Sequence, residues 1–139
     1  MNTNPIYIVD DDTDDEEILC DVMKELGLNN KLVFFHSANE LLSDLKNNPV
    51  VPFIIISDIN LPKIDGFELR QKILEETQMS DKSVPFIFWS TTASAAQIKK
   101  AYDLSAHGFF LKGRSYKEIK EGINEIIKYW TRSLSPATT

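Results

Sequence analysis

The stretch Ile6-Tyr7-Ile8-Val9-Asp10-Asp11-Asp12 sets four apolar residues directly before three carboxylates. Farther along the chain, three similar apolar runs end in polar groups: Phe53-Ile54-Ile55-Ile56-Ser57 in Asp58, Phe86-Ile87-Phe88-Trp89 in Ser90-Thr91-Thr92, and Phe109-Phe110-Leu111 in Lys112. Continuous apolar runs are typical of strands that are buried on both faces, as in parallel sheets. Because the C-terminal ends of parallel strands meet at one edge of a sheet, these polar groups are expected to converge there. Carboxylates, hydroxyls and one ammonium together favour a divalent cation beside a phosphoryl group.

Strand-like and helix-like segments alternate five times along the 139 residues, which predicts one α/β domain with a parallel sheet and crossover helices. The expected strands are 5–10, 31–36, 52–58, 84–90 and 107–112. The expected helices are 14–26, 38–47, 66–78, 94–105 and 116–131. Capping-box patterns, with Glu or Gln three residues later, begin at Thr13, Ser37, Ser94 and Ser115. Asp65 is expected to cap the third helix, and Gly27 to end the first helix in the left-handed conformation.

The composition is that of a folded globular domain, with 42% hydrophobic and 26% charged residues. No apolar run is long enough to span a membrane, and the first residues lack the pattern of a signal peptide. The lone Cys20 excludes an internal disulfide and favours a cytoplasmic location. Net charge is −6, and seven of the eight residues from Asp10 to Glu17 are acidic, which argues against direct binding to nucleic acid. Within this block, residues 14–17 are expected to form a solvated helix N-terminus stabilised by the helix dipole.

The ordered motifs resemble those of a two-component response-regulator receiver domain. They are Val9-Asp10-Asp11, then Asp58-Ile59-Asn60-Leu61-Pro62-Lys63-Ile64-Asp65-Gly66, then Ser90-Thr91, then Phe109-Phe110-Leu111-Lys112. The resemblance extends from about Pro5 to Trp130 and implies a flavodoxin-like, doubly wound sheet. Its five parallel strands are expected in the order 2-1-3-4-5, with five helices on both faces. The expected organisation is a stand-alone, CheY-like receiver over residues 1–132, a frayed tail over 133–139, and no output domain.

The resemblance also implies a role for each site residue. Asp58 is the expected phosphoacceptor, and Asp11, Asp58 and the backbone carbonyl of Asn60 are the expected ligands of Mg²⁺, with Mn²⁺ as an alternative metal. Asp10 is expected to orient metal-bound water. The expected contacts to phosphoryl oxygens come from the side chains of Lys112 and Ser90 and from the backbone amides of Ile59 and Thr91.

In this family, the phosphorylated protein changes a protein-binding surface. Ser90 is expected to move toward the phosphate, and Phe109 to enter the vacated space, so that the fourth helix, fifth strand and fifth helix repack. The expected phosphoryl donor is a sensor histidine kinase or a histidine-containing phosphotransfer protein, and the output is contact with a downstream protein target. Phosphorylation-dependent homodimerisation stays open. The expected protein is a phosphoacceptor that promotes its own phosphorylation and dephosphorylation, not an enzyme that turns over small substrates.

Four positions depart from the usual pattern of the family. Gly113 follows Lys112 where proline with a cis bond is usual, so a trans bond is expected here. Thr91 is larger than usual, Trp89 is a bulky neighbour of Ser90, and Asp12 either tunes metal affinity or lies in solvent.

Two other functions stay open. A degenerate receiver would act as a scaffold without phosphate. A phosphatase of the haloacid dehalogenase type would use the Asp-x-Asp pattern of Asp10 and Asp12, although Asp14 stands where that family has Thr or Val. His36, His107 and Cys20 are interpreted as structural residues.

Overall fold

The computed structural model describes residues 3–77 and 79–134, and five strands of this part form one parallel sheet. The strands are β1 (Ile6–Val9), β2 (Leu32–Phe35), β3 (Ile54–Ser57), β4 (Phe86–Ser90) and β5 (Gly108–Leu111). They lie in the order β2-β1-β3-β4-β5, which confirms the predicted doubly wound topology. The switch point therefore lies between β1 and β3, where Val9 pairs with Ser57.

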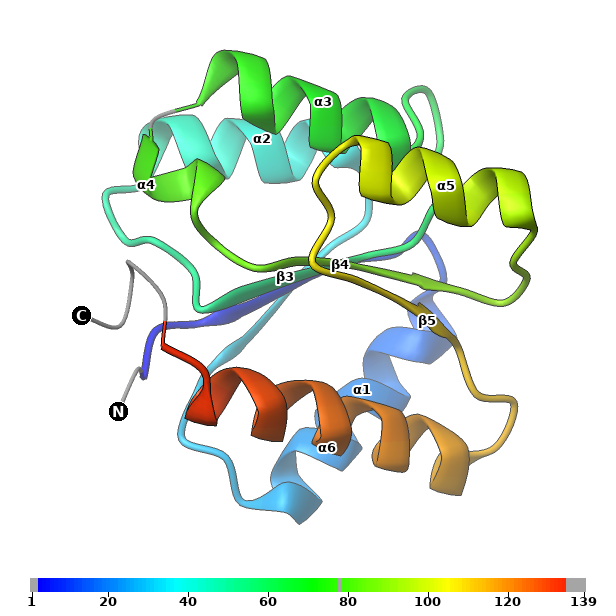
Figure 1. Cartoon of the computed structure of the whole chain (residues 1–139). Coiled ribbons are helices and arrows are strands. Elements are labelled where there is room, and N and C mark those ends of the chain that lie inside the picture. Colours follow the sequence, from blue (N-terminus) through cyan, green and yellow to red (C-terminus); the bar gives the residue numbers. More distant parts are fainter. Residues whose placement is uncertain (1–2, 78, 135–139) are drawn as a thin grey trace.

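Helices cover both faces of the sheet (Figure 1). On one face lie α2 (Ala38–Asn47), α3 (Gly66–Glu76), α4 (Met79–Lys82) and α5 (Ala95–Asp103); on the other lie α1 (Thr13–Leu26) and α6 (Tyr116–Arg132). All five predicted helices are present, and the single turn α4 is an addition that the sequence pattern did not indicate. The third helix was expected to reach residue 78 but ends at Glu76; residue 78, like 135–139 of the expected frayed tail, lies outside the described residues.

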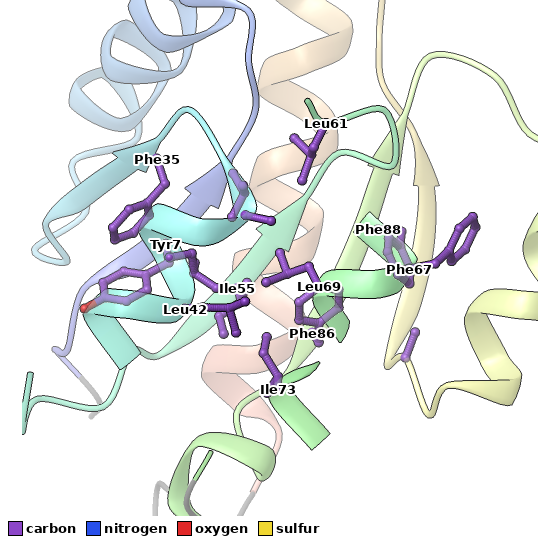
Figure 2. Close-up of a cluster of buried hydrophobic side chains, with 14 of the residues drawn as sticks. Tyr7, Phe35, Leu42, Ile55, Leu61, Phe67, Leu69, Ile73, Phe86 and Phe88 are labelled. Atoms are coloured by element: carbon purple, nitrogen blue, oxygen red, sulfur yellow. The ribbon is translucent and has the colours of Figure 1, made fainter. Parts of the chain in front are cut away.

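Alternating side chains of the strands build two cores. Tyr7, Ile55 and Phe88 point to the side of α2, α3 and α5, where they belong to the cluster shown in Figure 2. Ile8, Ile56 and Trp89 belong to the opposite core, beside α1 and α6. Both faces of the central strands are thus fully buried, which is why their sequences lack polar alternation. None of the helices in the described part of the chain is long and apolar enough to cross a membrane.

The predicted cap residues are confirmed except at the start of α1: Ser37, Asp65, Ser94 and Ser115 are N-caps. Of the predicted capping boxes, the one at Ser94 and Gln97 is complete, whereas Glu40 binds the His36 amide and Glu118 binds the Ser115 hydroxyl instead of the N-cap amide. Gly27 ends α1 with φ of 65°. The expectation for Thr13 was wrong: Asp12 is the cap of α1, and its side chain accepts a hydrogen bond from the Asp14 amide at 2.9 Å. An aspartate caps as well as a threonine does, so the helix begins one residue earlier than the capping box indicated.

Candidate functional site

Three carboxylates meet at the C-terminal edge of β1 and β3. The Asp10 amide donates to Phe35 at 3.0 Å, and the Asp58 amide donates to Val9 at 2.9 Å, so the sheet ladder continues into both aspartates. One carboxylate oxygen each from Asp10, Asp11 and Asp58 lies within 4.8 Å of the other two. Asp10 is buried, Asp58 half-buried and Asp11 exposed. A partly open set of hard oxygen ligands suits Mg²⁺ or Mn²⁺, because these ions keep several waters and take few protein ligands.

Asp58 is held by the loop that follows β3. Its Oδ1 accepts hydrogen bonds from the amides of Ile59 at 2.7 Å and of Asn60 at 3.3 Å. The Gly66 amide donates to the Ile59 carbonyl at 2.8 Å and closes this loop. A Cβ atom at Gly66 would collide with the backbone of Asp58 and Ile59, so only glycine permits this approach. The predicted phosphoryl-binding role of the Ile59 amide and the predicted metal-binding role of the Asn60 carbonyl stay predictions; the loop places the amides of both residues against the Asp58 carboxylate.

Lys112 follows β5 and extends back into the carboxylates. Its Nζ lies 2.6 Å from Asp10 Oδ2, 2.8 Å from Asp15 Oδ2 and 3.5 Å from Asp58 Oδ2. Burial opposes the charge of this ammonium, but its hydrogen bonds with Asp10 and Asp15 outweigh that effect and raise the pKa of Lys112. Burial, together with the neighbouring Asp15 carboxyl, raises the pKa of Asp10. The site therefore holds a charged, largely buried lysine among carboxyl groups whose exposure ranges from the buried Asp10 to the exposed Asp11.

Asp15 is the site residue that sequence reasoning missed. The sequence pattern predicts that it belongs to a solvated helix start, yet its side chain is only 17% exposed and it pairs with Lys112. The remaining acidic residues of that helix start behave differently: Asp14 and Glu17 are exposed, and Glu16 is paired with His36 at 3.1 Å. One feature of the sequence could have indicated its role: Asp15 lies in the first turn of a helix that starts beside the strand-end carboxylates.

Ser90 and Phe109 lie on the same face of neighbouring strands. Ser90 is fully buried, and its Oγ accepts a hydrogen bond from the Thr92 amide at 3.4 Å. Phe109 is half-buried and packs on Phe88, with ring centroids 6.2 Å apart. Trp89 points to the opposite core, so its bulk does not compete with Ser90 for space.

The positions that depart from the family pattern have structural explanations. Among the described residues no peptide bond is cis, so the trans bond expected before Gly113 is confirmed. A Cβ atom at Gly113 would lie 2.8 Å from the Glu118 carbonyl carbon and 2.9 Å from the Ile119 nitrogen, because this loop passes directly over the start of α6. Thr91 is exposed. Asp12 caps α1 and is outside the carboxylate group, which removes the second aspartate that the haloacid dehalogenase alternative requires.

Comparisons with known proteins agree with this geometry. The probable methanogenesis regulatory protein FilR2 of Methanothrix harundinacea is 23% identical over 95% of this chain and 88% of its own length. The crystal structure of the phosphorylated cyanobacterial phytochrome response regulator RcpA has a TM-score of 0.86 at 22% identity, covering 98% of this chain and 99% of that chain. The Mn²⁺-bound form of response regulator Rcp1 has a TM-score of 0.81 at 22% identity, covering 96% and 97%. The sequence profile of the response regulator receiver domain matches residues 6–124, so this chain belongs to the family of response regulator receiver domains.

Proposed function

We propose that this chain accepts a phosphoryl group on Asp58 from the phosphohistidine of a sensor histidine kinase or a histidine phosphotransfer protein. The observation that carries the proposal is the convergence of Asp58, two further carboxylates and Lys112 from the ends of three different strands. Receiver domains are signalling proteins and not enzymes for small substrates, so the product is a changed protein surface. The proposal places this protein in the cytoplasm, as the reduced cysteine and the family's partners lead us to expect.

The chemistry follows from the charges at the site. A carboxylate oxygen of Asp58 attacks phosphorus, the P–N bond breaks, and the imidazole leaves with the bonding electron pair. Lys112 neutralises charge on the transferring group, and amides at Ile59 and Thr91 and the Ser90 hydroxyl are proposed as hydrogen-bond donors to its oxygens. Asp11, Asp58 and the Asn60 carbonyl would hold Mg²⁺, which would supply further positive charge, and Asp10 would orient water bound to that ion. The existence of a Mn²⁺-bound form of response regulator Rcp1 supports the proposal that this chain binds a divalent ion.

The proposed output is a repacking of α5, β5 and α6, which are the predicted fourth helix, fifth strand and fifth helix. When the Ser90 hydroxyl turns toward the phosphoryl group, Phe109 can move inward from its half-buried place beside Phe88. The surface affected carries exposed apolar groups, Ile98 and Tyr102 on α5 and Leu111 on β5. Such residues would meet a protein target, and the phosphoryl group would shift the population between two packings.

The direct test is the intact mass of the purified chain after incubation with Mg²⁺ and acetyl phosphate. We expect one added phosphoryl group in the natural sequence and none in Asp58→Asn, which keeps the side-chain shape but removes the nucleophile. Asp65→Asn is the matched control, because Asp65 caps α3 in the same loop and is expected to leave phosphorylation intact.

The scaffold alternative makes the opposite prediction. A chain that shows no added mass with acetyl phosphate or with a phosphorylated histidine phosphotransfer protein would not be a working phosphoacceptor. If Asp58→Asn also left binding of the downstream partner unchanged, the protein would act as a scaffold without phosphate.

A further inference from the structure

Lys112 contacts three carboxylates, and one of them, Asp15, has no role in the proposed phosphoryl transfer. Its ammonium has three N–H donors, and three carboxylates surround it. The two short contacts, 2.6 and 2.8 Å, are made to Asp10 and Asp15, whereas the phosphoacceptor Asp58 is 3.5 Å away. In the unphosphorylated protein, the ammonium is therefore bound most closely to groups other than Asp58.

Asp15 is placed specifically for this contact. It is the third residue of α1, the position whose side chain turns back to the N-cap in a capping box. Here its carboxylate instead binds Lys112, 97 residues later in the chain. Asp15 is not part of the carboxylate group that can hold a metal ion, which consists of Asp10, Asp11 and Asp58. Its contact with Lys112 thus serves neither helix capping nor metal binding.

The charge of Asp15 is favoured by its surroundings. Its Oδ2 lies 2.8 Å from Lys112 Nζ, and this ion pair favours the charged carboxylate. The N-terminal turn of α1 also stabilises a negative charge. A carboxylate therefore stands beside the ammonium that a phosphoryl group would need.

We propose that Asp15 is a positioning residue that holds the Lys112 ammonium back from Asp58 and so lowers the affinity of the site for a phosphoryl group. This inference rests on the proposed function of Asp58. A phosphoryl oxygen on Asp58 must take an N–H donor of Lys112 in competition with the Asp15 carboxylate. The strength of that competition sets how readily the protein accepts a phosphoryl group and how long it keeps it.

The test compares Asp15→Asn with the natural chain and with Asp14→Asn. Asparagine keeps the shape of aspartate and removes its charge, and Asp14 is an exposed neighbour in the same helical turn, so both variants change net charge equally. The probe is beryllofluoride, a mimic of the phosphoryl group, titrated by calorimetry at saturating Mg²⁺. We expect Asp15→Asn to bind beryllofluoride about three- to tenfold more tightly, and Asp14→Asn to bind it as the natural chain does.

The same substitution in a chain that carries Lys112→Met tests whether Asp15 acts through Lys112. Asp15→Asn is expected to accelerate phosphorylation by acetyl phosphate in the natural chain, but not in a chain that already carries Lys112→Met. An acceleration that persists without Lys112, or an equal one in Asp14→Asn, would overturn the proposal in favour of a general effect of charge. Unchanged or weaker beryllofluoride binding in Asp15→Asn would also overturn it. If the natural chain bound no beryllofluoride, the proposed function itself would fail, which is a distinct result.

Discussion

At the scale of single residues, the site depends on two glycines that bring backbone segments together. Gly66 lets the start of α3 approach Asp58, and Gly113 lets the loop after Lys112 pass over the start of α6. Neither glycine has a positive φ angle, so their role is close approach and not a left-handed turn. Gly113 thus allows the loop to lie close against α6, at a position where the family usually has proline. Because Lys112 is its direct neighbour, a shift of Gly113 would displace the ammonium.

Gly113→Ala is expected to lower the free energy of unfolding by about 1–3 kcal/mol, since the added methyl group meets α6 backbone atoms that cannot move freely. It is also expected to weaken beryllofluoride binding through the displaced Lys112. Urea unfolding and calorimetry would measure the two effects.

The matched control is Gly122→Ala. A Cβ atom there would meet Trp89 at 3.6 Å, an ordinary contact, and Gly122 lies inside α6. Alanine at this helical position is expected to stabilise the protein by about 0.5–1 kcal/mol and leave beryllofluoride binding unchanged. Equal stability of the Gly113→Ala chain and the natural chain would show that the loop after Lys112 is less constrained than this contact indicates.

At the scale of elements, much of the architecture follows from local signals. Continuous apolar runs locate the five strands, and side-chain caps locate four of the five long helices, because both patterns depend on near neighbours in sequence. Contacts between distant elements leave no such local signal. Arg70 of α3 is buried and donates to the carbonyls of Leu104 and Ser105, just after α5, at 3.0 and 2.9 Å. Asp15 belongs to the same class, because its partner is 97 residues away.

His107 joins two elements and gives the fold a dependence on pH. It precedes β5, and its Nδ1 accepts a hydrogen bond from the Phe86 amide of β4 at 3.0 Å. Burial, with the nearby charge of Arg70, lowers the pKa of His107. Protonation of Nδ1 would also remove the acceptor for the Phe86 amide. The imidazole is therefore neutral in the folded protein at a pH where the unfolded chain already binds a proton.

The sign of the effect follows from this difference in bound protons. The contribution of neutral His107 to the free energy of unfolding is fully present above the ordinary histidine pKa of about 6.5. It is lost as the pH falls toward the lower pKa that His107 has in the folded protein. From pH 7.5 to 5.5, the natural chain is therefore expected to lose more unfolding free energy in urea than His107→Asn does. Asparagine keeps an acceptor and does not titrate, so other groups contribute equally to both chains. Equal losses in the two proteins would contradict this role of His107.

At the scale of the whole molecule, the site joins the ends of β1, β3 and β5 and concentrates negative charge there. Much of the net charge of −6 lies at this edge of the sheet, and Lys112 is its main internal counterion. A ligand that binds only the folded arrangement of these carboxylates adds its binding free energy to the stability of the fold. The proposed metal site therefore predicts an effect on global unfolding.

Mg²⁺ at about ten times its dissociation constant is expected to raise the free energy of unfolding by about 1.4 kcal/mol, measured by urea unfolding with NaCl of equal ionic strength as the reference. Asp11→Asn is the informative variant, because Asp11 is exposed and its loss removes an expected ligand while leaving the buried Asp10–Lys112 pair in place. In that variant the gain from Mg²⁺ should largely disappear. If Mg²⁺ raised the free energy of unfolding equally in Asp11→Asn and in the natural chain, the ion would be screening the negative charge of the protein in general and not binding at the carboxylate group. Because this measurement needs no phosphoryl donor, it tests the proposed metal site independently of the proposed acceptor role of Asp58.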